Sequence, residues 1–198
     1  MAESQGAISE VSIKYKEYLE RCGMVLEKGP DYWRSNPTLQ LIAQGESKRL
    51  EFKETLEADN QTGEKNLGVL ASSLKSIAAF LNTDGGTLII GVSDAGYIKG
   101  LKPDYSLCIK KDKDGFEQKL RSLIATRLVP QPFGKIAVEF DIVELHEVCR
   151  VEVGISDEII HLDHRDVYVR DGNTSRKLEG AALTSWIRTR TLKMNGNR

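Results

Sequence analysis

Residues 67–94, LGVLASSLKSIAAFLNTDGGTLIIGVSD, are the stretch that decides the fold. Apolar side chains recur at helical spacing from Leu67 to Leu81, which predicts an amphipathic helix. The polar turn 82–86 ends in two glycines, whose backbone reaches positive φ at little steric cost directly after a helix. The apolar, β-branched run 87–93 then predicts a buried strand. A helix, a tight turn and a strand therefore form the centre of the predicted domain.

Further elements extend this unit in both directions. Apolar residues that alternate with polar ones at 136–142 and 149–153 predict a pair of strands in a hairpin. The other expected strands are 48–56, 97–99, 159–162 and 166–170, and the other expected helices are 8–26, 38–44, 116–128 and 178–192. These elements predict an α+β fold, with one mixed β-sheet and helices packed on it. We expect a helical extension over residues 1–37, one domain over 38–192 and a tail over 193–198.

The composition fits an ordinary globular protein. The chain has 198 residues, 40% of them hydrophobic, and no apolar run long enough for a membrane helix, so we expect no membrane contact. Three widely spaced cysteines argue against a disulfide framework and, with a polar amino-terminal stretch, favour a cytoplasmic location. Residues 165–198 carry eight Lys or Arg against three Asp or Glu, which indicates either an anionic partner or a solvated basic end.

The first candidate site lies at the strand 48–56. Side chains alternate along a strand, so Glu51 and Lys53 share one face. Many metal-dependent nucleases need such a pair, because the carboxylate holds a divalent cation and the lysine stabilises developing charge. Glu46 lies just before the strand and can bring a second carboxylate to the same point. The alternative is an exposed ion pair on an edge strand.

The second candidate site follows the buried strand 87–93. Gly91 inside an apolar run indicates a close backbone approach or a bulge. Asp94 ends the strand, where functional carboxylates and ordinary turn residues both occur. A phosphate-binding loop is a weak alternative, since its glycine-lysine motif is absent and the glycines end a helix.

Together these segments resemble a known family. The stretches ESKRLEFK at 46–53 and AFLNTDGGTLIIGVSD at 79–94 occur in the order and spacing of the Schlafen AlbA-type domain, also called the divergent AlbA domain. The stretch VYVRDGNTSR at 167–176 is similar to the closing strand and arginine-bearing turn of the same family. The resemblance covers roughly residues 38–190 and leaves the amino-terminal helix outside.

The resemblance implies nucleic-acid handling, either by binding DNA or RNA or by cutting it. Animal relatives cleave structured RNA such as transfer RNA with two glutamates and an aspartate, which fall here at Glu46, Glu51 and Asp94. The resemblance therefore implies a possible endoribonuclease with these three acids as metal ligands, and three oxygen ligands suit Mg²⁺ or Mn²⁺ rather than Zn²⁺. Lys53 would stabilise charge on the phosphate that reacts.

The resemblance also suggests where nucleic acid is held. Phosphate contacts are predicted for Arg170, Arg176 and Lys177, with Lys110, Lys111 and Lys113 as outer contacts. The animal proteins have two tandem lobes and this chain has one, so a homodimer would restore a complete groove.

Two alternative functions stay open. The first is a nucleic-acid-binding or regulatory module without turnover, and the second, weaker one is an ATP-binding module. We expect no zinc site, because the pairs His146-x-x-Cys149 and His161-x-x-His164 lack a four-ligand spacing. Cys149 alternates with core valines and is expected to be a small buried hydrophobe.

Overall fold

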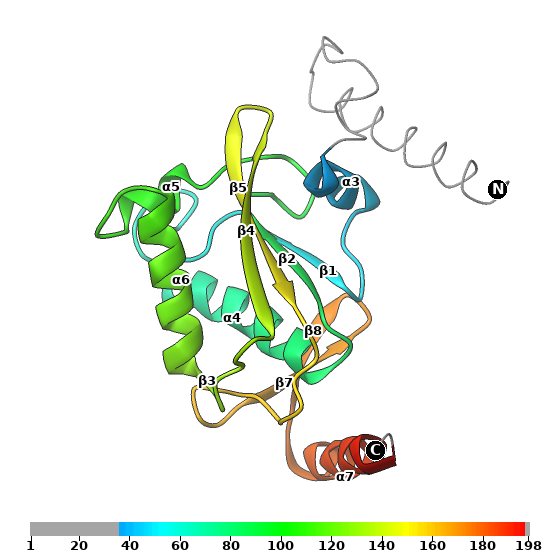
Figure 1. Cartoon of the computed structure of the whole chain (residues 1–198). Coiled ribbons are helices and arrows are strands. Elements are labelled where there is room, and N and C mark those ends of the chain that lie inside the picture. The colour runs from blue at the N-terminus through cyan, green and yellow to red at the C-terminus, as the bar shows by residue number, and fades with distance from the viewer. Residues whose placement is uncertain (1–35, 197–198) are drawn as a thin grey trace, which may run out of the picture.

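The computed structural model describes residues 36–196, and the predicted helix 8–26 lies outside them (Figure 1). The described helices are α3 (Pro37–Gln44), α4 (Leu67–Asn82), α5 (Lys102–Ser106), α6 (Lys113–Arg127) and α7 (Gly180–Gly196). The strands are β1 (Leu50–Lys53), β2 (Gly86–Ile90), β3 (Leu128–Val129), β4 (Ile136–Val143), β5 (His146–Val153), β6 (His161–Leu162), β7 (Val167–Asp171) and β8 (Thr174–Leu178). None of the helices within this part of the chain is both long and apolar enough to cross a bilayer.

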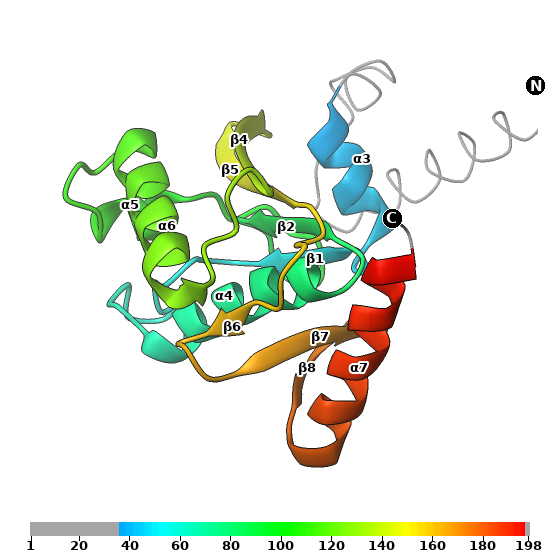
Figure 2. The ribbon, with the colours of Figure 1, turned by 60° about the horizontal axis from the view of Figure 1, so that its bottom comes forward.

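The central sheet has four strands in the order β1-β2-β5-β4. β1 runs parallel to β2, while β5 pairs antiparallel with both β2 and β4, so the sheet is mixed. The predicted α+β class with a mixed sheet is therefore confirmed. The pairs β3–β6 and β7–β8 form two further two-stranded sheets. α4 lies between the central sheet and the β7–β8 hairpin (Figure 2).

The unit that decides the fold forms as the sequence predicts. Asn66 begins α4, because its side chain accepts the backbone N–H groups of residues 68 and 69. Gly85 follows the helix at φ 69°, in the left-handed region that glycine adopts easily. Gly86 then starts β2, and a Cβ at this position would lie 2.5 Å from the Phe80 ring and 2.8 Å from the Arg49 carbonyl oxygen. The chain can turn this tightly only because the position has no side chain.

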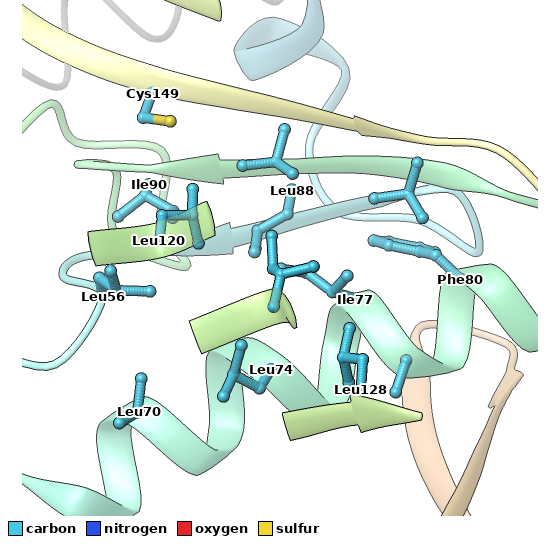
Figure 3. Packing of buried hydrophobic residues seen from close by; sticks show 14 of the residues in the cluster. Leu56, Leu70, Leu74, Ile77, Phe80, Leu88, Ile90, Leu120, Leu128 and Cys149 are labelled. Carbon is cyan, nitrogen blue, oxygen red and sulfur yellow. The ribbon is translucent and has the colours of Figure 1, made fainter. Parts of the chain in front are cut away.

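Apolar side chains fill both sides of the central sheet. On the α4 side, Leu74 and Ile77 meet Leu88 and Ile90 of β2 in a core that also takes in side chains from α6 and β3 (Figure 3). Cys149 is fully buried in the same core, as predicted. On the other side, α3 covers the sheet with a smaller cluster. The two cores fix α4 and β2 as the rigid centre of the domain.

Asn82, expected in a turn, is instead the last residue of α4 and is buried. Its amide nitrogen donates to the carbonyl oxygens of Ile160, at 2.8 Å, and Tyr168, at 3.0 Å. Its amide oxygen accepts the backbone N–H of Ile160 at 2.8 Å. One side chain therefore satisfies the backbone of two segments that pass the carboxyl end of α4.

The remaining differences concern short elements. The first strand spans only four residues, and the expected strand 97–99 is reduced to a single bridge between Val92 and Ile98. α5 and β8 were not expected. α5 is only five residues long, too short for a helical apolar stripe, and β8 is largely exposed, so neither element leaves an apolar pattern in the sequence.

Candidate nucleic-acid interface

β1 places the first two predicted site residues. Leu50 and Phe52 face the α3 side and are buried there, which turns Glu51 and Lys53 toward α4, on one shared face as predicted. The two side chains are 12% and 18% exposed, and the Lys53 ammonium lies 2.8 Å from Glu51 Oε1. Ser76 of α4 donates to the same carboxylate oxygen at 3.3 Å. The pair is therefore half-enclosed by the helix rather than displayed on an open strand edge.

Arg170 of β7 completes the surroundings of Glu51. Its Nη1 donates to Glu51 Oε2 at 2.7 Å, and its side chain is only 1% exposed. The other guanidinium nitrogens donate to the carbonyl oxygens of Ser47, at 2.8 Å, and Lys48, at 3.2 Å. The guanidinium carbon also lies 4.9 Å from the centre of the Phe80 ring. This burial contradicts the phosphate contact predicted for Arg170, since every nitrogen already binds the protein; the residue instead positions Glu51.

Two carboxylates at this site have opposite pKa shifts. Burial pushes the pKa of Glu51 upward, but the hydrogen bonds and charges of Lys53 and Arg170 outweigh it, so the net pKa is lowered. The pKa of Glu46 is raised, first by burial and then by the charges of Glu51 and Asp94, although Glu46 Oε1 accepts the Phe52 N–H at 2.9 Å. The charges of two of the predicted acids therefore act in the same direction as burial on the pKa of the third.

Asp94 lies at the rim of an open pocket beyond β1 and β2. These parallel strands end at the same edge of the sheet, where the pocket of about 540 Å³ is lined by Lys53, Asn60, Ser72, Asp94, Tyr97 and Lys99, among others. Asp94 and Lys99 are exposed. Lys53 therefore connects the ion pair with the pocket, because it pairs with the half-buried Glu51 and also lines the pocket.

The arrangement does not form a ready metal site. Within residues 36–196, no group of three or more His, Cys, Asp or Glu side chains is placed to hold a metal ion. Both oxygens of Glu51 accept hydrogen bonds from cations, Lys53 and Arg170, and the positive charges of these groups oppose the binding of a metal cation at the same carboxylate. Hard oxygen donors are present, but they are not arranged as ligands of Mg²⁺ or Mn²⁺.

The other predicted phosphate contacts are exposed but do not gather on one face. Arg176 is 60% exposed and lies 3.2 Å from Asp171, while Lys177 pairs with two acids, Asp166 and Glu179. The exposed residues Lys110, Lys111 and Lys113 follow α5, on the opposite side of the molecule from the β7–β8 hairpin (Figures 1 and 2).

Sequence reasoning missed most of the pocket lining, including Asn60, Tyr97 and Lys99. These three residues come from two loops, and only the fold brings them to the pocket that Lys53 lines. The glycine turn after Asp94 is a sequence feature that indicates a reversal, and it could have suggested that 97–99 returns to the strand end.

Comparison with known proteins identifies the family to which the chain belongs. The family model described as "Schlafen, AlbA_2" matches residues 46–179, which is 134 of the 198 residues. The chain therefore belongs to the Schlafen AlbA_2 family, as the sequence resemblance indicated.

Two solved structures are similar to this chain. One is the DIP2311 protein from Corynebacterium diphtheriae, with 22% identity and a TM-score of 0.49, covering 72% of this chain and 24% of that one. The other is the N-terminal domain of a putative ATP-dependent DNA helicase RecG-related protein from Nitrosomonas europaea, with 23% identity and a TM-score of 0.39, covering 59% of this chain and 72% of that one. The chain thus spans about a quarter of the first of these proteins.

Proposed function

We propose that this domain binds nucleic acid, with the pocket at the ends of β1 and β2 as its contact site. The observation that carries the proposal is the placement of two lysines, Lys53 and Lys99, along one open pocket of about 540 Å³. Lys99 is exposed, and its ammonium group pairs with no acid within residues 36–196. An unpaired ammonium at an open pocket suits a phosphate, and nucleic-acid handling is what the family resemblance implies.

Fluorescence anisotropy with labelled transfer RNA and single-stranded DNA tests this proposal. Wild-type affinity is expected to fall steeply as salt rises from about 50 to about 200 mM, because phosphate contacts release counterions. Lys99→Ala is expected to weaken binding and to lower the salt slope by about 0.7–0.9. Arg188→Ala is the matched control, because Arg188 is also exposed, has no acid partner in the described part and lies on α7, away from this pocket. Equal effects of the two variants, or tight ATP binding without nucleic-acid affinity, would contradict the proposal.

The second candidate function is a metal-dependent endoribonuclease that acts on structured RNA. One observation favours it: Lys53, which pairs with Glu51, lines the same pocket as Asp94, so one lysine stands between two of the predicted acids. Incubation of transfer RNA with Mn²⁺ or with chelator separates this candidate from a binding module. Cleavage that needs the metal and disappears in Glu51→Gln and Asp94→Asn would support the nuclease. Salt-sensitive binding without cleavage in Mg²⁺ or Mn²⁺ would support the module alone.

A homodimer belongs to the same proposal. β4 is an eight-residue strand at the outer edge of the central sheet, and no strand of the described residues pairs with its free side. A free edge can pair with the same edge of a second copy, which would place two interfaces on one particle. Light scattering coupled to size exclusion should give twice the chain mass of 22.1 kDa, and a monomer across the accessible concentrations would contradict it.

A further inference from the structure

A second pocket lies between the tip of the β4–β5 hairpin and α5. Its volume is about 450 Å³, and Tyr105 and Leu145 contribute aromatic and apolar surface to its lining. Lys102 and Lys111 also line it. An apolar wall beside cationic groups suits a ligand with a flat apolar part and an anionic part.

The two-residue hairpin tip that borders this pocket places residues other than Gly and Asn at positive φ. Glu144 and Leu145 lie at φ 51° and 67°, in the left-handed region that side chains other than Gly and Asn adopt at a cost. Leu145 is nevertheless 89% exposed, so no core contact holds it there. The tip keeps a large apolar side chain in a strained turn at the edge of a pocket, which points to a contact made outside the domain core.

The charges around the pocket select an anion. Lys102 and Lys111 are exposed and pair with no acid among the described residues, and the same holds for Lys110 beside them. The acid in the lining, Glu147, accepts the Tyr105 hydroxyl at 3.0 Å and keeps its negative charge. The lining therefore carries two lysines against one acid, and the exposed lysines lie where a phosphate could approach from solvent.

One short segment connects this pocket with the first. Tyr97 and Lys99 line the pocket at the ends of β1 and β2, whereas Gly100 to Lys102 line the second. The backbone N–H groups of Lys99 and Gly100 both donate to the Gly91 carbonyl oxygen, at 2.7 and 3.0 Å, which fixes the segment against the end of β2. Lys99 therefore lines the first pocket and Lys102 lines the second, three residues further along the same segment.

We propose that the second pocket receives an unpaired nucleotide of the bound strand. The base packs against Leu145 and Tyr105, and the flanking phosphates contact Lys102 and Lys111. This inference rests on the proposed nucleic-acid binding and narrows its ligand to a strand with at least one unstacked base, since a base held in a duplex cannot enter a pocket. In this arrangement Lys111, which was predicted as an outer contact, holds a phosphate beside the second pocket.

The test uses anisotropy with the whole chain and three labelled RNAs: an oligouridine strand, the same strand with abasic sites, and a blunt duplex. Lys102→Ala and Lys111→Ala should each lower the salt slope for oligouridine by about 0.7, whereas Arg188→Ala should not. Leu145→Asn should weaken oligouridine binding about three- to tenfold and leave the abasic strand nearly unchanged, because only the base contact is lost. Asn adopts the left-handed conformation readily, so this variant should melt no lower than wild type.

The outcomes separate the two levels of the proposal. If wild type binds oligouridine and the Lys102, Lys111 and Leu145 variants match Arg188→Ala, the second pocket is not a nucleotide site, while nucleic-acid binding stands. Equal affinity for oligouridine and its abasic counterpart in wild type would also overturn the inference. If wild type binds none of the three RNAs and no single-stranded DNA, the proposed function fails and the inference fails with it.

Discussion

Removal of the Arg170 guanidinium should destabilise the domain strongly. The side chain is 1% exposed, and its partner Glu51 is 12% exposed. Arg170→Ala leaves Glu51 Oε2 and the carbonyl oxygens of Ser47 and Lys48 without these donors. Breaking a buried pair from one side costs about 3–5 kcal/mol, because the remaining charge stays buried. At about 2–4 °C per kcal/mol for a domain of this size, the melting temperature should fall by roughly 6–20 °C.

Thermal unfolding followed by circular dichroism measures this change, with urea unfolding as a second readout. Arg121→Ala is the control, because Arg121 pairs with Glu117 on the surface of α6 and is 53% exposed. Such a pair contributes only about 0.5 kcal/mol. Arg170→Lys keeps the charge without the planar fork of donors and should fall between wild type and Arg170→Ala. If Arg170→Ala and Arg121→Ala lowered stability equally, the positioning role of Arg170 would be wrong.

Three further predictions concern single residues and one concerns pH. Asn82→Ala should lower the urea midpoint by an amount equivalent to about 2–4 kcal/mol, because the buried backbone of Ile160 loses its partners. Gly86→Ala should melt well below wild type, since its Cβ would meet the Phe80 ring at 2.5 Å. Burial raises the pKa of the Cys149 thiol, so this residue should resist alkylation in the folded protein and react in urea, as peptide mass spectrometry would report. Finally, burial raises the pKa of Glu51, but Lys53 and Arg170 lower it by more, so the net pKa lies below the ordinary 4.5. The stabilising contribution of Glu51 is therefore present above pH 4.5 and is lost as pH falls through the folded pKa. Urea midpoints measured across acid pH should fall less steeply with pH in Glu51→Gln than in wild type.

The long periodic elements could be predicted because their patterns are local. The apolar stripe of α4, the run that forms β2 and the alternation in β4 and β5 each identify an element without knowledge of its neighbours. β8 could not be found this way, since its exposed polar residues are held by pairing with β7 rather than by an apolar face.

The candidate site was predictable in part. Glu51 and Lys53 share a face because strand side chains alternate, which the sequence alone determines. The burial of Arg170 depends on a partner 119 residues away, and an arginine in a polar turn looks like a surface residue when only its neighbours are known. Lys99 was missed for a similar reason, because its place beside Lys53 follows from how the loop after Asp94 returns to the sheet.

The contact between β7 and β1 has a consequence for dissection of the domain. The three predicted acids, Glu46, Glu51 and Asp94, all precede β7 in the chain, so a fragment that ends before β7 would still contain them. Such a fragment would keep Lys53 but lack Arg170, the second cation beside Glu51, so the Glu51 carboxylate would take up protons more readily than in the intact domain. A shortened form of the protein could therefore contain all three acids and still differ from the intact domain in the protonation of Glu51.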